Sequence, residues 1–313
     1  MRKFNNTKIA ISGFIAVGVL FISLVIGISP VARAAQSTVN LGAAAPFAIL
    51  AGTPNISDAG NTSVINGNVG LSPATGAGIG LLCSEVVTGT IYSVDAAGPL
   101  PCRVTNGPLM VIAKNNLTNA YIDATGRTQI TTVPTELGGT TLVAGVYGST
   151  STTFGITAGA GALTLNGQDD PSSVFIFQAP FSGNGLTVGD GSTIALINGA
   201  QACNVFWRVD TASIGTTANF VGTILALNSI TAANGATVSG RLLARNGNVT
   251  LINDTITTST CAGNDTSDNT VIVPGLPNTG IFGSQSLLWI VIPSSVILVI
   301  LLLAYVGRRK HLI

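Results

Sequence analysis

The residues that could carry out covalent chemistry are few and lie far apart in this 313-residue chain. Glycoside hydrolysis requires two cooperating carboxylates, and the only adjacent acidic residues are Asp169 and Asp170. They belong to the segment Gly167–Pro171, whose composition is typical of a turn. The single histidine, His311, lies close to the C-terminus, and no Cys/His spacing indicates a zinc site. We therefore expect no enzyme, no metal and no cofactor.

The N-terminus has the features of an export signal. Three basic residues precede the apolar stretch Ile9–Ile28, and the small residues Ala32, Ala34 and Ala35 follow it. These are the parts of a secretory signal peptide, so residues 1–34 are predicted to be removed after Ala34. An uncleaved membrane anchor is the alternative, because the apolar stretch is long for a signal.

The C-terminus combines a short motif with an apolar run, Leu287–Val306, and a basic tail at 307–313. About 20 apolar residues can span a bilayer, and the basic tail should remain cytoplasmic. The order of motif, span and tail resembles the LPxTG sorting signal of sortase substrates. That resemblance implies cleavage by a sortase, attachment to cell-wall peptidoglycan and residues 261–275 as a short linker; a plain membrane anchor is the alternative. The motif residues are Leu276, Pro277, Asn278, Thr279 and Gly280.

Charge is sparse between the two ends. Of 13 Lys and Arg residues, four lie within 1–34 and three within 307–313, whereas all 12 acidic residues lie between Asp58 and Asp268. The remaining part carries a net charge of about −6, which offers no basic surface for nucleic acid. Apolar residues alternate regularly within 39–260, which argues against disorder. We expect one all-β domain there, held outside the membrane at the cell surface.

Four cysteines lie in this exported part, and an even number suggests two disulfides. Sequence alone leaves the pairing open. Pairing Cys83 with Cys102 and Cys203 with Cys261 is favoured, because the second bond would fasten the end of the domain.

Short apolar segments recur in three interleaved series that share a step of about 18 residues. This repeat predicts a mainly β, three-faced β-solenoid whose coils stack about 4.8 Å apart. Alternation along each strand places the flanking residues inside and the central residue outside. On the first face the outward residues expected are Phe177, Trp207, Leu225 and Leu243.

A column of large apolar groups needs a cover, and the segment 108–125 is predicted to supply it as one long α-helix. Pro108 stands at its start and Gly126 follows its end. The aromatic residues of the first face are then core packing rather than a binding platform. The apolar residues at helical spacing are Met110, Ala113, Leu117, Tyr121 and Ala124.

On the second face the outward column consists of hydroxyl residues. Threonine places a methyl beside a hydroxyl and its β-branching limits rotation, so such a column forms a rigid, uncharged array able to order water as in ice. An ordinary strand surface is the alternative, because threonine favours strands. The outward column is Thr157, Thr187, Ser213, Thr231 and Thr250. The residues three positions further along are Ala160, Asp190, Thr216, Asn234 and Asn253.

Motifs distributed over 39–257 make the chain similar to the microbial ice-binding protein family, which is built on a discontinuous β-solenoid with a helix alongside. Among them are Val39–Gly42, Val64–Gly70, Val174–Gln178, Asn198–Trp207 and Gly240–Gly247. The resemblance implies binding to ice planes through one flat face, without cofactor or turnover. The bacterial pattern of Thr, Ala or Gly, any residue, then Thr or Asn is complete only at 231–234, and Asp190 departs from it. The ice-binding residues predicted are Thr157, Thr187, Ser213, Thr216, Thr231, Asn234, Thr250 and Asn253.

Two alternatives remain open. A wall-anchored adhesin could use the same face for another surface or a glycan, although sugar platforms favour outward Tyr or Trp, which these columns lack. The third face could also replace the second as the binding surface. Its outward residues are Thr164, Ala195, Asn219, Thr237 and Thr255.

Overall fold

The computed structural model describes residues 36–128, 130–179, 183 and 185–262. The predicted signal peptide, sorting motif, apolar span and basic tail lie outside the described residues, as does nearly all of the linker. Within the described part, no helix has both the length and the apolar character needed to cross a bilayer.

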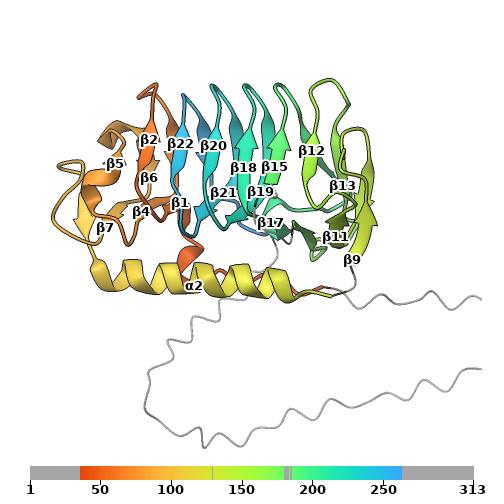
Figure 1. Ribbon diagram of the computed structural model, residues 1–313, viewed down its shortest axis with the longest axis horizontal. Coiled ribbons are helices and arrows are strands. Elements are labelled where there is room, and N and C mark those ends of the chain that lie inside the picture. Colours follow the sequence, from red (N-terminus) through yellow and green to blue (C-terminus); the bar gives the residue numbers. More distant parts are fainter. Residues whose placement is uncertain (1–35, 129, 180–182, 184, 263–313) are drawn as a thin grey trace, which may run out of the picture. The chain divides into compact units, whose positions relative to one another are not determined.

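The described chain is mainly β with one long helix, as expected, and its strands pair in parallel within three sheets (Figure 1). Parallel pairing of successive turns produces stacked coils, the arrangement that the sequence repeat predicts. The 13-stranded sheet contains β1 (Phe47–Ala51), β3 (Val64–Asn66), β4 (Asn68–Leu71), β6 (Val86–Thr88), β7 (Ile91–Ser93), β8 (Arg103–Thr105), β9 (Ile130–Val133), β11 (Gly145–Ser149), β14 (Phe175–Gln178), β17 (Val205–Val209), β19 (Asn219–Ala226), β21 (Thr237–Ala244) and β23 (Thr255–Thr257). The seven-stranded sheet contains β2 (Ile56–Asp58), β5 (Ile79–Gly80), β12 (Phe154–Ile156), β15 (Gly185–Val188), β18 (Thr211–Ile214), β20 (Ile230–Ala232) and β22 (Val249–Leu251). The three-stranded sheet contains β10 (Thr141–Val143), β13 (Leu163–Asn166) and β16 (Ile194–Ile197).

The stack does not follow chain order. Strand β1 pairs with β21 on one side and β4 on the other, and β2 lies between β22 and β5. The N-terminal coils, orange in Figure 1, therefore lie directly against the last coils, which are blue. This is the discontinuity that the family resemblance implies, and it extends each face with strands from the start of the domain.

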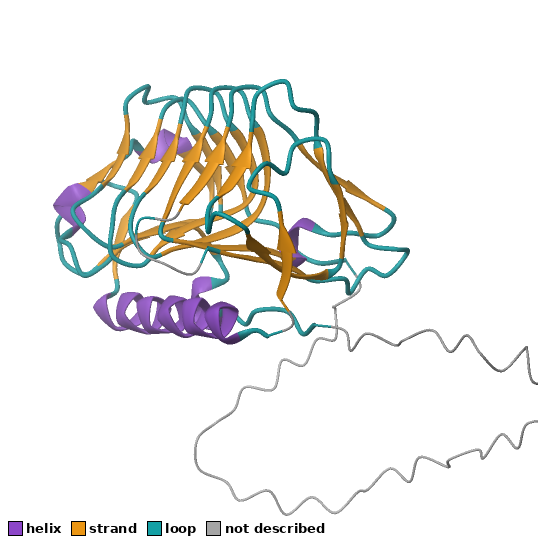
Figure 2. Cartoon of the chain, turned by 45° about the vertical axis from the view of Figure 1, so that its right-hand side comes forward, coloured by secondary structure: helices purple, strands orange, loops and turns teal. Residues whose placement is uncertain are grey.

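One long helix, α2 (Gly107–Gly126), lies along the 13-stranded sheet (Figure 2). The side chain of Asn106 caps it by accepting a hydrogen bond from the Leu109 N–H at 3.0 Å. Its buried residues include all five predicted at helical spacing, and it packs over Leu225 and Leu243 of the sheet. The expected cover and two of the four covered residues are thus confirmed.

The other two residues expected under the helix lie in the solenoid interior instead. Phe177 and Trp207 stack with ring centroids 3.9 Å apart inside the main core, and the helix contacts their neighbours Ile176 and Phe206. The reason is register: Trp207 pairs with Ile224, so this coil has 17 residues rather than 18. Prediction of Phe177 and Trp207 as outward residues was therefore wrong.

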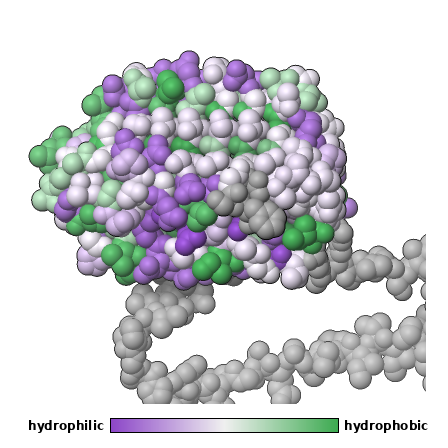
Figure 3. Space-filling model, in the orientation of Figure 1, coloured by the Kyte–Doolittle hydropathy of each residue, from purple (hydrophilic) through white to green (hydrophobic). Residues whose placement is uncertain are grey.

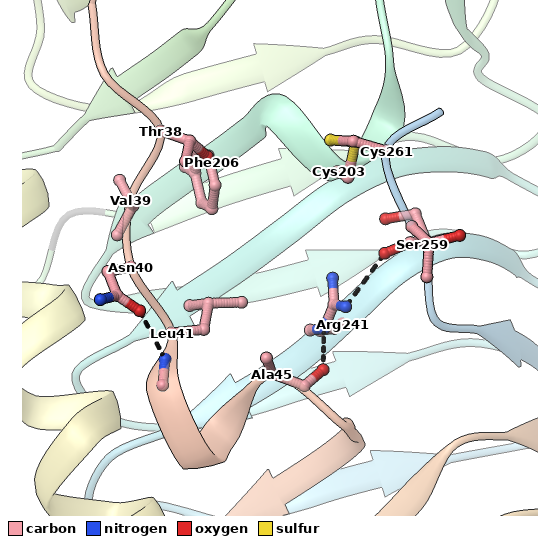
Figure 4. A pocket seen from close by; sticks show the side chains of 12 residues that line it. Thr38, Val39, Asn40, Leu41, Ala45, Cys203, Phe206, Arg241, Ser259 and Cys261 are labelled. Atoms are coloured by element: carbon pink, nitrogen blue, oxygen red, sulfur yellow. Dashed lines mark hydrogen bonds between the residues drawn. A yellow bond between two sulfur atoms is a disulfide. The ribbon is translucent and has the colours of Figure 1, made fainter. Parts of the chain in front are cut away.

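Both ends of the described domain are fastened to each other. Cys83 bonds to Cys102 and Cys203 to Cys261, the pairing that the sequence favours. Close to the second disulfide, the guanidinium of Arg241 donates to the carbonyl oxygens of Ala45 at 2.7 Å and Ser259 at 3.0 Å (Figure 4). One side chain therefore joins the N-terminal and C-terminal segments across a surface pocket.

Candidate functional site

The seven-stranded sheet presents an uncovered surface, the seven-strand face, formed by the outward residues of β12, β15, β18, β20, β22, β2 and β5. At its centre five hydroxyl residues from five successive coils stand in register, and we call them the hydroxyl file. Glycines continue the column at both ends, Gly155 before the file and Gly80 after it. The hydroxyl file is Thr187, Ser213, Thr231, Thr250 and Ser57.

A second file runs beside the first, two residues earlier on each strand and hence on the same face. Two of its members are joined to each other and to the hydroxyl file: Ser229 Oγ donates to Asn248 Oδ1 at 2.6 Å, and Asn248 Nδ2 donates to Thr250 Oγ1 at 3.0 Å. These bonds hold the side chains in fixed rotamers. The second file is Gly185, Thr211, Ser229, Asn248 and Asn55.

The seven-strand face is accessible and uncharged along both files. Thr187, Ser213 and Thr231 are exposed, while the apolar residues beside them on each strand are buried. In Figure 3 the surface over these strands consists mostly of pale residues of intermediate hydropathy. The alternation that the sequence predicts is therefore present, and the coils set the spacing between hydroxyls at about 4.7–4.9 Å.

Thr157 is a correction to the predicted column. Strand β12 pairs Gly155 with Thr187, so Thr157 lies two residues beyond the hydroxyl file. It is held there by Glu136, whose carboxylate accepts hydrogen bonds from the Thr157 N–H at 3.1 Å and from its hydroxyl. Burial acts to raise the pKa of Glu136, but these bonds and one from the Gly138 N–H outweigh it and lower that pKa. The hydroxyl file accordingly ends at Thr187.

The predicted row three residues further along lies in the turns that border the face. Thr216 and Asn234 belong to turns, and the Thr216 N–H donates to Asp190 Oδ1 at 2.8 Å. Asn253 Nδ2 donates to Asn234 Oδ1 at 2.8 Å. Its backbone, however, has a φ of 54°, which is the left-handed conformation that Gly235 adopts in the preceding coil. That turn is one residue shorter, so Asn253 is out of register. The Asp190 carboxylate lies at this border and not within either file.

Two buried carboxyl groups lie at the N-terminal end of the face. Burial, and then the adjacent Asp58 carboxyl, raise the pKa of Glu85 from 4.5 to about 7. Burial also acts to raise the pKa of Asp58, but hydrogen bonds from Glu85 and from the Gly60 and Ser63 N–H groups outweigh it and lower that pKa. The pair therefore holds one proton near neutral pH. Asp58 follows Ser57 directly, so this pair supports the last hydroxyl of the file.

The N-terminal members of both files, Asn55 and Ser57, are not among the residues predicted from the sequence. They lie nearly 200 residues from their partners Asn248 and Thr250 in the chain. The segment Asn55-Ile56-Ser57 has the same alternation as the later strands, so the signal was present. Its place in the stack follows from the chain discontinuity and not from a regular step.

Comparisons with known proteins agree with this architecture. The sequence profile of the family described as ice-binding-like matches residues 49–257, which is the greater part of the chain. The chain belongs to this family. An ice-binding protein from a Colwellia species is 39% identical over 82% of this chain and 94% of its own length. The ice-binding protein of Flavobacterium frigoris (strain PS1) is 41% identical over 70% of this chain and 76% of its own length.

Solved structures of ice-binding proteins share the fold of this family member. An ice-binding protein from an Antarctic biological consortium superimposes with a TM-score of 0.63 at 35% identity, covering 74% of this chain and 96% of that chain. The corresponding domain of Shewanella frigidimarina ice-binding protein 1 gives 0.64 at 29% identity, covering 73% and 100%. The mainly β fold with one helix is therefore common to this chain and its relatives.

Proposed function

We propose that this protein adsorbs to ice through the seven-strand face and thereby inhibits the growth or recrystallisation of ice. One observation carries the proposal: five hydroxyl residues from five successive coils lie in register on one uncovered sheet surface, in a file that contains no charged residue. Membership of the ice-binding-like family supports it. A glycan platform is disfavoured, because neither file contains a Tyr or Trp.

The backbone provides the regularity that this function needs. Parallel coils repeat at about 4.7–4.9 Å, close to an oxygen repeat in ice, and each coil adds one member to each file. Threonine hydroxyls continue a water lattice, while the methyl groups limit competing water orientations. Because β-branching holds χ1 nearly fixed, little side-chain entropy is lost when an ice plane adsorbs. No reaction step is involved.

Growth of a single ice crystal in a solution of the purified protein tests the proposal. We expect faceted crystals whose growth stops just below the melting point, and small grains after prolonged annealing of a frozen sample. Round discs that grow at the rate seen in buffer would reject ice binding for this chain.

We also propose that the protein is exported and attached to the cell wall. The order of signal peptide, Leu276–Gly280 motif, apolar run and basic tail supports this, although all four lie outside the described residues. The test is fractionation of cells that produce the full chain. Enzymatic digestion of peptidoglycan should release the protein, and Thr279→Ala should transfer it to the detergent-soluble membrane fraction. An unchanged distribution of that variant would exclude sorting by this motif.

A further inference from the structure

A second uncovered surface, the long-strand face, lies on the 13-stranded sheet and carries two files of its own. It is formed by the first halves of β19 and β21 together with β23, β3 and β6. Its first file is Asn219, Thr237, Thr255 and Val64. Its second file is Val221, Ser239, Thr257, Asn66 and Thr88.

We propose that the long-strand face is a second ice-binding surface, which adsorbs to a set of ice planes different from that bound by the seven-strand face. This inference rests on the proposed function, and it assigns a separate site to the same ligand. The long-strand face has the same geometry as the seven-strand face. Its two files lie two residues apart along each strand, successive members of a file lie one coil apart, and no member is charged.

Two paired glycines, one in β19 and one in β21, separate this face from the surface under the helix. Gly222 pairs with Gly240, and a Cβ on Gly240 would lie 1.8 Å from the Gly222 carbonyl oxygen. The chain beyond this point leads to Leu225 and Leu243, which pack against α2. The half of each strand before the glycines is not covered by the helix, and Thr237, Ser239 and Thr255 there are exposed. The sheet therefore contributes one covered and one open surface.

Side-chain hydrogen bonds fix part of the second file in place. Thr88 Oγ1 donates to Asn66 Oδ1 at 3.2 Å, and Asn66 Nδ2 donates to Thr257 Oγ1 at 3.2 Å. Three successive coils are thus linked on the surface, which makes the array rigid before any ligand adsorbs. Rigid hydroxyl and amide groups at constant spacing match a crystalline water surface better than a flexible peptide partner.

The face has a defined limit at the other end. Thr164 pairs with Ala195 as predicted, but Asn219 bridges to Thr193, so the register shifts by two residues between β16 and β19. The predicted third column is therefore two separate columns. The continuous strand pairing of the long-strand face begins at Asn219. Ala195, two residues beyond Thr193, is level with Val221, so Thr164 and Ala195 line up with the second file and not with the first.

The test is to let fluorescently labelled protein adsorb to a growing single-crystal ice hemisphere and to record which planes become labelled. Three variants are compared with the parent: Thr231→Tyr on the seven-strand face, Ser239→Tyr on the long-strand face, and both together. Ser239 is exposed and lies between Val221 and Thr257 in its file. Equal melting temperatures by circular dichroism establish that each variant is folded.

We expect the parent to label two sets of planes, each single variant to lose a different set, and the double variant to lose both. If Ser239→Tyr labels the same planes as the parent and Thr231→Tyr labels none, the second site is overturned and the proposed function stands. Absence of labelling by the parent would reject both. A change in sedimentation from dimer to monomer in Ser239→Tyr, without a change in labelling, would instead assign the face to self-association and overturn the inference.

Discussion

Two faces of the same coils meet opposite surroundings. The helix-covered face presents Ile176, Phe206, Leu225 and Leu243, all at most 1% exposed, to α2. The seven-strand face presents Thr187, Ser213, Thr231 and Thr250 without any covering element. The strands pair in parallel on both faces, so the backbone gives both the same spacing between coils. The side chains determine whether another element covers the face. The face with bulky apolar side chains is covered by the helix α2, whereas the face with short hydroxyl side chains stays open to water.

The largest expected effect follows from truncating one residue on each face. Leu225→Ala removes a side chain that is 0% exposed and should lower the free energy of unfolding by about 2–5 kcal/mol. Thr231→Ala on the seven-strand face should change it by less than about 0.5 kcal/mol. Urea denaturation followed by circular dichroism measures both. Equal losses would contradict the division between a structural face and a binding face.

Lys114, a residue of α2, gives the helix-covered face its own pH dependence. Its ammonium donates to the carbonyl oxygens of Ala244 at 2.8 Å and Arg245 at 2.6 Å, and burial, then the charge of Arg245, lowers its pKa from 10.5 to about 7. Between those pH values the unfolded chain holds a proton that the folded protein lacks. The free energy of unfolding should therefore rise from pH 7 to 10. In Lys114→Met this rise should be absent; a parallel pH profile in parent and variant would refute the assignment.

Glu85, at the end of the seven-strand face, should show the opposite slope over a lower range. Burial raises its pKa from 4.5 to about 7, so the folded protein retains a proton that the unfolded chain releases. The free energy of unfolding should fall as pH rises from about 4.5 to 7. Glu85→Gln imitates the protonated form and should remove this part of the fall. If the variant loses stability with pH as steeply as the parent, the Asp58–Glu85 pair does not share a proton as described.

The smallest expected effect concerns a single methyl group on the seven-strand face. Ser213 is the one serine between threonines in the hydroxyl file. Ser213→Thr adds a methyl and restricts χ1, so it should slightly lower the protein concentration needed to prevent recrystallisation. Stability should be almost unchanged, because the side chain is exposed. The same substitution at Ser172, in an exposed turn away from both faces, serves as the control and should have no effect on ice.

The sequence predicts elements with strong local signals well and register poorly. The helix was expected at 108–125 and is found at Gly107–Gly126, because its proline, its final glycine and its apolar spacing are all local signals. Four of the five predicted hydroxyl residues occupy one file for a similar reason: each stands between two buried apolar neighbours. The long-range pairing of Ser57 with Thr250 has no local signal.

Register fails where both sides of a strand are apolar. Strand β17 contains Phe206 and Trp207 in succession, one facing the helix and one facing the interior. Alternation of polar and apolar residues cannot show which side chains face inward when both sides of a strand are apolar. The sequence therefore does not distinguish a coil of 17 residues from one of 18. Asn253 was misplaced for a different reason: the turn between β22 and β23 is one residue shorter than the turn in the preceding coil. On the open face, where polar and apolar residues alternate, no such slip occurred between Thr187 and Thr250.

The most direct test of the central claim compares two variants that gain the same side chain on opposite sides of the molecule. Thr231→Tyr places a ring on the seven-strand face, and Val111→Tyr places one on the exposed side of α2, where Val111 is 54% exposed. Each is measured by the shape and growth of a single ice crystal just below its melting point. We predict that Val111→Tyr facets ice as the parent does and that Thr231→Tyr does so much more weakly. Equal faceting by both variants would contradict the assignment of ice binding to the seven-strand face.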